Sequence, residues 1–132
     1  MVLASGKIAN HGLDLRIDLR AGSGEDLADT ALYDMAWVPS AFIPEAAIPA
    51  ILDRVQAALK PGGWLIFAMI RRAPDALATA TTRFRTAVWG GSLLPFDAVA
   101  AAMQRVGLSS VRLLDGPAHS TIGMVAAQRA AE

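Results

Sequence analysis

The sequence predicts an α/β domain in which helices pack on a mostly parallel sheet. Two short, almost wholly apolar runs, residues 33–38 and 64–70, are typical of strands that are buried on both faces. Between them, residues 44–59 place apolar side chains at steps of three and four, which predicts an amphipathic helix. A helix between two buried strands indicates a crossover connection that makes the strands parallel. At 132 residues, the chain has room for one domain.

The N-terminal part contains one predicted strand with a single wet face. Apolar and charged side chains alternate along residues 13–20, and this period of two is that of a half-buried strand. Ala21-Gly22-Ser23-Gly24 is predicted to end it, and Pro39-Ser40 ends the next strand. The apolar members of the alternating run are Leu13, Leu15, Ile17 and Leu19.

The predicted crossover helix has a start signal and a stop signal. Pro44 stands near its first turn, where a missing amide hydrogen costs no hydrogen bond. Lys60-Pro61-Gly62-Gly63 is predicted to end it, because proline cannot continue a helix and glycine accepts a left-handed turn. Residues 64–70, which follow, form the most apolar run of the chain and are predicted to be the central strand.

The C-terminal part predicts two more helices and a hairpin. Residues 74–88 are expected to be helical, and Trp89-Gly90-Gly91-Ser92 is expected to form a loop. Pro95 opens a second helix. Residues 110–114 and 122–128 are predicted strands, and because the link between them is too short for a crossover, they should pair antiparallel.

The composition argues against several classes of function. The formal net charge is zero and the basic residues are scattered, so we expect no nucleic-acid partner. There is no cysteine and there are only 2 histidines, so we expect no metal site. No apolar run reaches the roughly 18 residues of a membrane span, so we expect a cytoplasmic protein without membrane contact. Hydrophobic residues make up 54% and charged residues 18%, which indicates apolar surface that another chain, or a missing part of this one, would bury.

Several of these segments resemble a known family. Tyr33-Asp34-Met35-Ala36-Trp37, then a helix, then Leu59-Lys60-Pro61-Gly62-Gly63-Trp64-Leu65-Ile66 is similar to strands four and five of class I S-adenosylmethionine-dependent methyltransferases. Residues 12–27 look like the third strand of that family and the loop after it, and Trp89-Gly90-Gly91 and the final hairpin also fit. The resemblance covers nearly the whole chain and corresponds to the C-terminal half of the family.

The resemblance implies a partial Rossmann-like methyltransferase sheet. The family has the strand order 3-2-1-4-5-7-6 with strand seven antiparallel, and this chain would supply the equivalents of strands 3, 4, 5, 6 and 7, ending in an antiparallel hairpin. The Gly-x-Gly-x-Gly segment, which in the family forms the main cradle of the cofactor, does not occur in the sequence. We therefore expect residues 1–132 to be a single methyltransferase-like domain that is N-terminally truncated.

The resemblance also implies which residues would contact S-adenosylmethionine. Ser23, Gly24 and Glu25 match the loop that brackets adenine, and Trp37 and Val38 match the end of strand four beside the sulfonium. The family usually has an aspartate at the position of Ser23, and a hydroxyl is a weaker acceptor than a carboxylate. We expect cofactor binding by this chain alone to be weak or absent.

The loops contain candidates for binding a small-molecule acceptor. Phe42 and Trp89 either line an apolar pocket or pack in the core. His119 is either a substrate-binding general base, because histidine titrates near neutral pH, or a solvated side chain in a turn. Asp34 is expected to cap a neighbouring backbone or face solvent. No catalytic residue is assigned. The arginines that either recognise an acidic acceptor or form a solvated helix face are Arg71, Arg72, Arg83 and Arg85.

Two functions of different classes remain open. The first is a small-molecule methyltransferase in truncated form, which is expected to be inactive as this chain alone. Methyl transfer requires few specialised side chains, because the sulfonium is already activated and the protein mainly aligns the acceptor. The second function is that of a non-enzymatic Rossmann-like module for interaction or dimerisation. An exposed strand edge invites pairing with a second copy, so we expect a homodimer.

Overall fold

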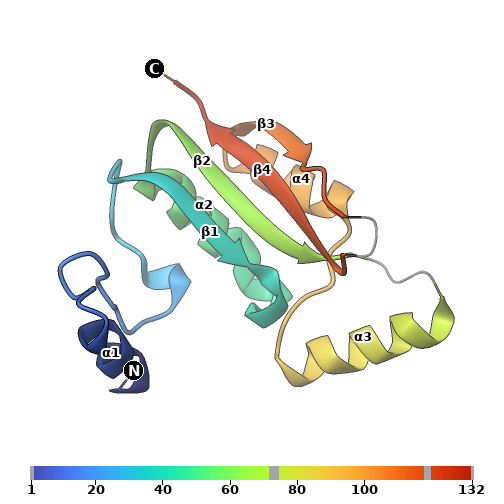
Figure 1. Ribbon diagram of the computed structural model, residues 1–132. Coiled ribbons are helices and arrows are strands. Elements are labelled where there is room, and N and C mark those ends of the chain that lie inside the picture. The colour runs from blue at the N-terminus through green and yellow to red at the C-terminus, as the bar shows by residue number, and fades with distance from the viewer. Residues whose placement is uncertain (1, 72–74, 118–119, 132) are drawn as a thin grey trace.

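The computed structural model describes residues 2–71, 75–117 and 120–131. Within these residues, four strands form one mixed sheet in the order β1-β2-β4-β3 (Figure 1). At one edge of the sheet, β1 (Tyr33–Pro39) pairs in parallel with β2 (Leu59–Ile70). This parallel pair confirms the crossover that the two apolar runs predict.

The other half of the sheet is antiparallel. β4 (Ile122–Arg129) pairs with β2 on one side and with β3 (Leu108–Leu113) on the other, so the predicted hairpin is confirmed. β3 begins before the predicted residue 110, and its register shifts around Ser110, whose φ is 53°. The order of the strands matches strands four, five, seven and six of the sheet that the family resemblance implies.

α2 (Ile48–Ala58) makes the crossover between β1 and β2. The α-helix begins after Pro44, which has an extended backbone with ψ of 138° and is followed by a short 3-10 helix, η3 (Glu45–Ala47). It ends at Leu59, from which the chain continues directly into β2. The buried stripe of the helix consists of Ile48, Ile51, Leu52, Val55 and Ala58.

The segment Lys60-Pro61-Gly62-Gly63, which is predicted to end the helix, lies at the start of β2. The pairing register with β1 shifts within residues 59–64. Gly62 has a φ of 76°, in the left-handed region that favours glycine, and a Cβ on Gly63 would lie 2.9 Å from the carbonyl oxygen of Lys60. Lys60 Nζ forms an exposed ion pair with Asp34 Oδ1 at 2.8 Å across the two strands. The glycines therefore allow the irregular backbone at the start of β2, where its register with β1 shifts.

One face of the sheet is covered by α2 and α4 (Phe96–Arg105), which both lie behind the sheet in Figure 1. α4 buries Val99, Ala102 and Met103 in the same core as α2. α3 (Ala76–Val88) lies beyond the carboxyl end of β2, at the lower right of Figure 1, and Thr86 is the one fully buried residue among its members. α3 is therefore attached to the domain far more loosely than α2.

The opposite face of the sheet, turned toward the viewer in Figure 1, carries no helix among the described residues. Residues that pair across a sheet point to the same side, so Trp37, Ile66 and Ala126 share this face. Met35 is 65% exposed and Trp37 54% exposed. A sheet that contains parallel strands is usually covered on both faces. The structure thus presents an open apolar face where a second layer would ordinarily lie.

The predicted strand over residues 13–19 is wrong. These residues form turns and irregular backbone, and Leu15 is 96% exposed. A strand is stable only where a neighbouring strand accepts its backbone hydrogen bonds, and β1 is the edge of the described sheet. The predicted α/β fold class is therefore confirmed for the equivalents of strands four to seven. The equivalent of strand three is absent from the described residues. Conversely, α1 (Val2–Asn10) has no counterpart in the sequence-based prediction.

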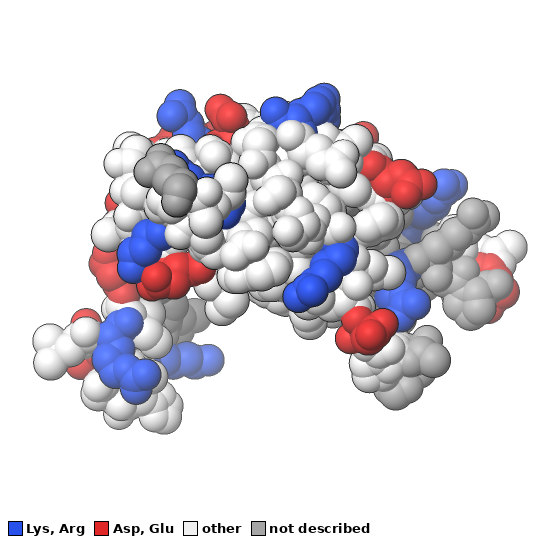
Figure 2. Space-filling model, turned by 90° about the horizontal axis from the view of Figure 1, so that it is seen from above, with Lys and Arg blue, Asp and Glu red and all other residues white. Residues whose placement is uncertain are grey.

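Charged side chains are distributed over the surface without a large patch of one sign in the view of Figure 2. That view shows lysine and arginine interspersed with aspartate and glutamate around an uncharged centre. The absence of a nucleic-acid partner stays a prediction. None of the helices in the described ranges is long and apolar enough to cross a lipid bilayer.

Candidate functional site

A cleft of about 670 Å³ opens beside the carboxyl end of β1. One wall is formed by residues 20–29, and the other by β1 and α2. Ligands of open α/β sheets bind beyond the carboxyl ends of the strands, which makes this cleft the candidate functional site. Its larger apolar side chains are Leu27, Trp37, Val38, Ile43, Ile51 and Val55.

The loop wall is held in place by a short 3-10 helix, η1 (Gly24–Asp26). Ser23 caps this helix, because its Oγ accepts a hydrogen bond from the Glu25 amide at 3.3 Å. The same hydroxyl donates to Glu25 Oε2 at 3.2 Å. A Cβ on Gly24 would lie 3.3 Å from the Ile51 side chain, so the loop packs closely on α2. The Ser23 hydroxyl is thus already engaged in local hydrogen bonds.

The rim of the cleft is organised by one arginine. Arg20 Nη1 donates to Asp29 Oδ2 at 2.7 Å, and Arg20 Nε donates to Asp18 Oδ2 at 3.0 Å. The Tyr33 hydroxyl also donates to Asp29 Oδ2, at 3.3 Å. The hydrogen bond from Arg20 lowers the pKa of Asp29, and its partners Asp29 and Asp18 raise the pKa of Arg20. Both groups are therefore charged at neutral pH.

The structure places four of the five predicted cofactor-contacting residues around this cleft. Ser23, Gly24, Trp37 and Val38 all line it, although they come from separate parts of the chain. Glu25 is not among the lining residues, and its carboxylate accepts the hydrogen bond from Ser23. The role of all five residues in cofactor binding stays a prediction.

Sequence reasoning missed the polar residues of the cleft. Arg20, Asp26 and Asp29 line it, and Asp26 forms no ion pair within the described residues. Asp26 is thereby a free carboxylate at the edge of an apolar cleft. No sequence pattern identifies Arg20 and Asp29 as site residues, because their ion pair forms only when the loop folds back on β1. Asp26 lies beside the predicted Ser23-Gly24-Glu25 segment, which is the one signal that could have identified it.

Phe42 and Trp89, the predicted acceptor-contacting residues, lie against each other. Their ring centroids are 5.5 Å apart with an interplanar angle of 33°, and Arg85 Cζ lies 5.1 Å from the Trp89 centroid. Phe42 is 62% exposed and Trp89 45% exposed, so the alternative that they are core residues is wrong. Binding of an acceptor by this pair stays a prediction.

The aromatic pair is fixed by a close contact between two loops. Phe42 ends the short 3-10 helix η2 (Ser40–Phe42), which follows β1. The Ser92 amide donates to the carbonyl oxygen of Ser40 at 3.2 Å. A Cβ on Gly91 would overlap the carbonyl oxygen of Ala41, so this crossing requires glycine. The loop after α3 is therefore locked to the end of β1, next to the cleft.

The remaining candidates contribute little to the site. His119 lies outside the described residues. Asp34 faces solvent, as one of its two expected roles requires, and it forms an exposed ion pair with Lys60. Within the described ranges, no group of three His, Cys, Asp or Glu residues could hold a metal ion. Arg72 also lies outside the described residues.

The cleft suits the adenosyl end of S-adenosylmethionine, the cofactor that the resemblance implies. Apolar walls on both sides can hold a flat adenine ring, and the Asp26 carboxylate can accept a hydrogen bond from its amino group. The chain has no Gly-x-Gly-x-Gly segment for the methionine end. The residues present thus fit part of the cofactor.

The fold is similar to part of the α/β fold of solved methyltransferase structures, and two of these neighbours illustrate the likeness. The S-adenosylmethionine-dependent methyltransferase SibL in its apo form is similar with a TM-score of 0.78 at 16% identity, over 96% of this chain and 40% of that chain. The mitomycin 7-O-methyltransferase MmcR is similar with a TM-score of 0.77 at 21% identity, over 96% of this chain and 38% of that chain.

The same comparison also includes an enzyme with a different reaction. The [4+2]-cyclase SpnF is similar with a TM-score of 0.69 at 14% identity, over 99% of this chain and 63% of that chain. This chain spans about two fifths of the length of the two methyltransferases. No protein-family model and no curated protein matches the sequence. At these identities the comparisons establish the fold, and the function has to be argued from the site.

Proposed function

We propose that this chain is a methyltransferase-type domain that binds S-adenosylmethionine and acts on a small-molecule acceptor. The observation that carries the proposal is the cleft at the carboxyl end of β1. It gathers Ser23, Gly24, Trp37 and Val38 beside the Phe42–Trp89 pair. The methyltransferase neighbours support the proposal through their fold.

The residues of the chain would act by positioning. S-adenosylmethionine supplies an activated methyl group on its sulfonium, so the protein has to orient the acceptor and exclude water. In this proposal Asp26 accepts a hydrogen bond from the adenine amino group, Trp37 and Val38 border the sulfonium, and the Phe42–Trp89 pair binds the face of the acceptor. No residue is assigned as a general base.

A titration with S-adenosylhomocysteine tests the proposal. We expect amide NMR shifts confined to residues 20–29, the end of β1 and the first half of α2. The affinity should be weak, with a dissociation constant above about 100 µM, because adenine-side contacts are only a fraction of the cofactor cradle. Absence of any localised shift at saturating ligand would contradict the cleft as a cofactor site. Micromolar affinity would contradict the expected weakness.

A matched pair of variants links the shifts to the cleft. Asp26→Asn should weaken S-adenosylhomocysteine binding about three- to tenfold, because it removes a charged hydrogen-bond acceptor. Asp115→Asn, which lies after β3 and outside this cleft, should leave the affinity unchanged. Equal loss in both variants would point to a general charge effect and not to a contact with adenine.

The second candidate function is a non-enzymatic module that pairs with another chain. The open apolar face of the sheet favours it, together with the exposed Met35 and Trp37 on the edge strand β1. In this proposal the partner is a second copy of the chain. A cytoplasmic location also stays a prediction.

A further inference from the structure

A second cavity, of about 530 Å³, lies beyond the carboxyl end of β2. It is bounded by the end of β2, by α3 and by the segment that leads into α4. Of the ten described residues that line it, six are apolar, and the others are Arg71, Arg83, Thr79 and Thr82. Neither the cofactor cleft nor the aromatic pair uses any of these residues.

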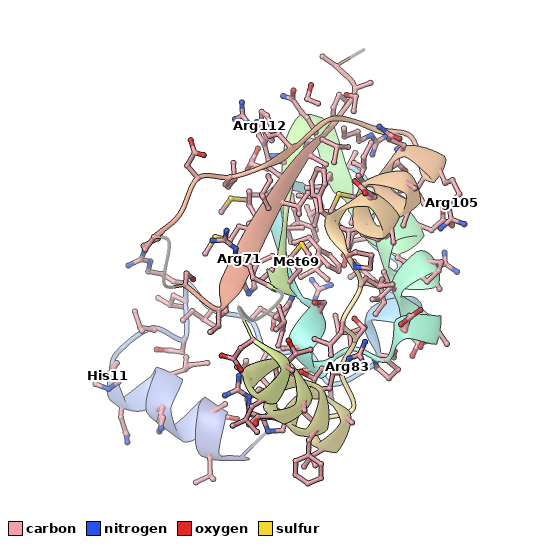
Figure 3. All side chains as sticks on the ribbon, turned by 90° about the vertical axis from the view of Figure 1, so that its right-hand side faces the viewer. His11, Met69, Arg71, Arg83, Arg105 and Arg112 are labelled. Carbon is pink, nitrogen blue, oxygen red and sulfur yellow. The ribbon has the colours of Figure 1, made fainter. Side chains whose placement is uncertain are left out.

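Two arginines line this cavity from different elements. Arg71 follows the last residue of β2, and Arg83 lies on α3, as the labels in Figure 3 show. Among the described residues, no carboxylate lines the cavity and neither arginine forms an ion pair. Arg20 is the contrast, because it binds two aspartates. The second cavity therefore has an unbalanced positive charge.

Arg71 is positioned by the sheet and is not simply a solvated side chain. Its amide donates to the carbonyl oxygen of Thr121 at 2.8 Å. A Cβ on Gly123 would lie 3.0 Å from Arg71 Cγ and 3.5 Å from Met69 Cγ, so glycine leaves space for both side chains. Figure 3 shows Met69 and Arg71 together at this end of the sheet. The stem of Arg71 thus lies over Gly123 of β4, while the residue as a whole stays exposed.

The cavity lies at the same end of the sheet as the cofactor cleft, beyond the carboxyl ends of the strands. β1 and β2 are parallel, so their carboxyl ends point the same way. Trp89 directly follows α3, whose residues Thr79, Thr82 and Arg83 line the cavity. The Phe42–Trp89 pair is therefore connected to the cleft through η2 and to the second cavity through α3.

We propose that this cavity binds a small aromatic carboxylic acid. The ring would lie against Met69, Leu94 and Phe96, and the carboxylate would receive hydrogen bonds from Arg71 and Arg83, since a guanidinium presents paired donors that match a carboxylate. The mostly apolar lining favours an organic acid over a bare inorganic anion. The cavity is separate from the cofactor cleft and from the Phe42–Trp89 pair, so this inference goes beyond the proposed function and does not require the cofactor.

The test is a titration of the full chain with 4-hydroxybenzoate and with 4-hydroxybenzamide, which has nearly the same shape without the charge. We expect the acid to shift amide resonances of residues 69–71, 79–83 and 93–96, and to bind at least about fivefold more tightly than the amide. Arg71→Gln and Arg83→Gln should each weaken binding of the acid about five- to tenfold. Arg105→Gln removes another exposed arginine, which lies on α4 (Figure 3) and does not line the cavity, and it should leave the affinity unchanged.

Three results would overturn the inference. They are equal affinity for acid and amide, equal weakening by Arg105→Gln, and shifts that lie outside the cavity. Because Arg71 and Arg83 are exposed, their variants should fold, and circular dichroism checks this. A parallel titration with S-adenosylhomocysteine separates the two proposals. Acid binding without S-adenosylhomocysteine binding keeps this site and contradicts the methyltransferase, and the reverse result removes this site alone.

Discussion

Arg129, the last residue of strand β4, forms hydrogen bonds with the C-terminal end of α2. Its Nη1 donates to the carbonyl oxygens of Gln56, Ala57 and Leu59, with a distance of 2.9 Å to Ala57. The last carbonyl groups of a helix lack partners within the helix and carry partial negative charge, which a guanidinium satisfies. The partly buried position of Arg129 makes these hydrogen bonds more valuable than those of an exposed arginine.

We expect Arg129→Gln to lower the free energy of unfolding by about 2 kcal/mol, because the carbonyl groups lose a charged donor. Urea denaturation followed by circular dichroism measures the change. Arg105→Gln is the control, and it should change the free energy by less than about 0.5 kcal/mol. An Arg129→Gln variant as stable as the parent chain would show that water replaces the guanidinium without cost.

The Arg20–Asp29 pair predicts how stability depends on pH. The pKa of Asp29 is lowered from its ordinary value of 3.8 in the folded state, chiefly by the hydrogen bond from Arg20. A lowered pKa stabilises the fold above the unfolded-state pKa, and this stabilisation is lost as the pH falls through the folded-state value. Stability should thus decline below about pH 4. Asp29→Asn should remove part of this decline, measured as the thermal midpoint against pH.

Asp34→Asn is the control for the pH experiment. Its ion pair with Lys60 is exposed and lies away from the cleft, and solvent screens such pairs. We therefore expect the pH profile of Asp34→Asn to follow that of the parent chain. A parent profile that stays flat through acidic pH would contradict the assigned role of Asp29.

At the scale of elements, α2 and α3 differ in how they are attached. α2 buries five residues against the sheet, whereas α3 buries Thr86 alone. The buried Thr86 Oγ1 has no hydrogen-bond partner among the described residues. The large apolar side chains on α3 that remain exposed are Leu77, Phe84 and Val88. Leu77, Phe84 and Val88 recur at steps of seven and four, so they lie on one exposed side of the helix.

We expect the amides of α3 to exchange with deuterium much faster than those of α2. Local opening costs little where few apolar contacts are broken, and α2 can open only with the core. Hydrogen exchange measured by mass spectrometry checks this prediction. Equal protection of the two helices would indicate that another chain covers α3 in solution.

The same difference explains which elements could be predicted from the sequence. α2 and α4 were predictable because apolar residues recur at helical spacing and bury against the sheet. The alternating run at residues 13–19 had an equally clear pattern and yet forms no strand. Its pattern describes the face that a strand would bury, whereas strand formation also requires a neighbour with free backbone groups.

At the scale of the whole molecule, the uncovered face and free edge of the sheet predict self-association. Met35 and Trp37 are exposed on the edge strand β1, and the chain has an apolar content of 54%. Edge strands with free backbone groups pair readily with a second strand. We expect a homodimer whose fraction rises with protein concentration, as measured by size-exclusion chromatography with light scattering.

Met35→Lys should shift this equilibrium toward the monomer, because a charge on an edge strand opposes pairing. Leu77→Lys on α3 is the control, since it adds the same charge away from the strand edge. Its dimer fraction should match that of the parent chain. A parent chain that is monomeric at every concentration would contradict strand-mediated dimerisation.

The sequence by itself determined the strands at residues 33–38 and 64–70, the helix between them and the C-terminal hairpin. These elements depend on local patterns, namely apolar periodicity and the turn-forming segment Lys60-Pro61-Gly62-Gly63. The tertiary structure alone decided that residues 13–19 stay irregular and that one face of the sheet is open. It also brought Arg71 and Arg83 to one cavity. Strand pairing and the meeting of distant side chains depend on neighbours in space, which no local pattern specifies.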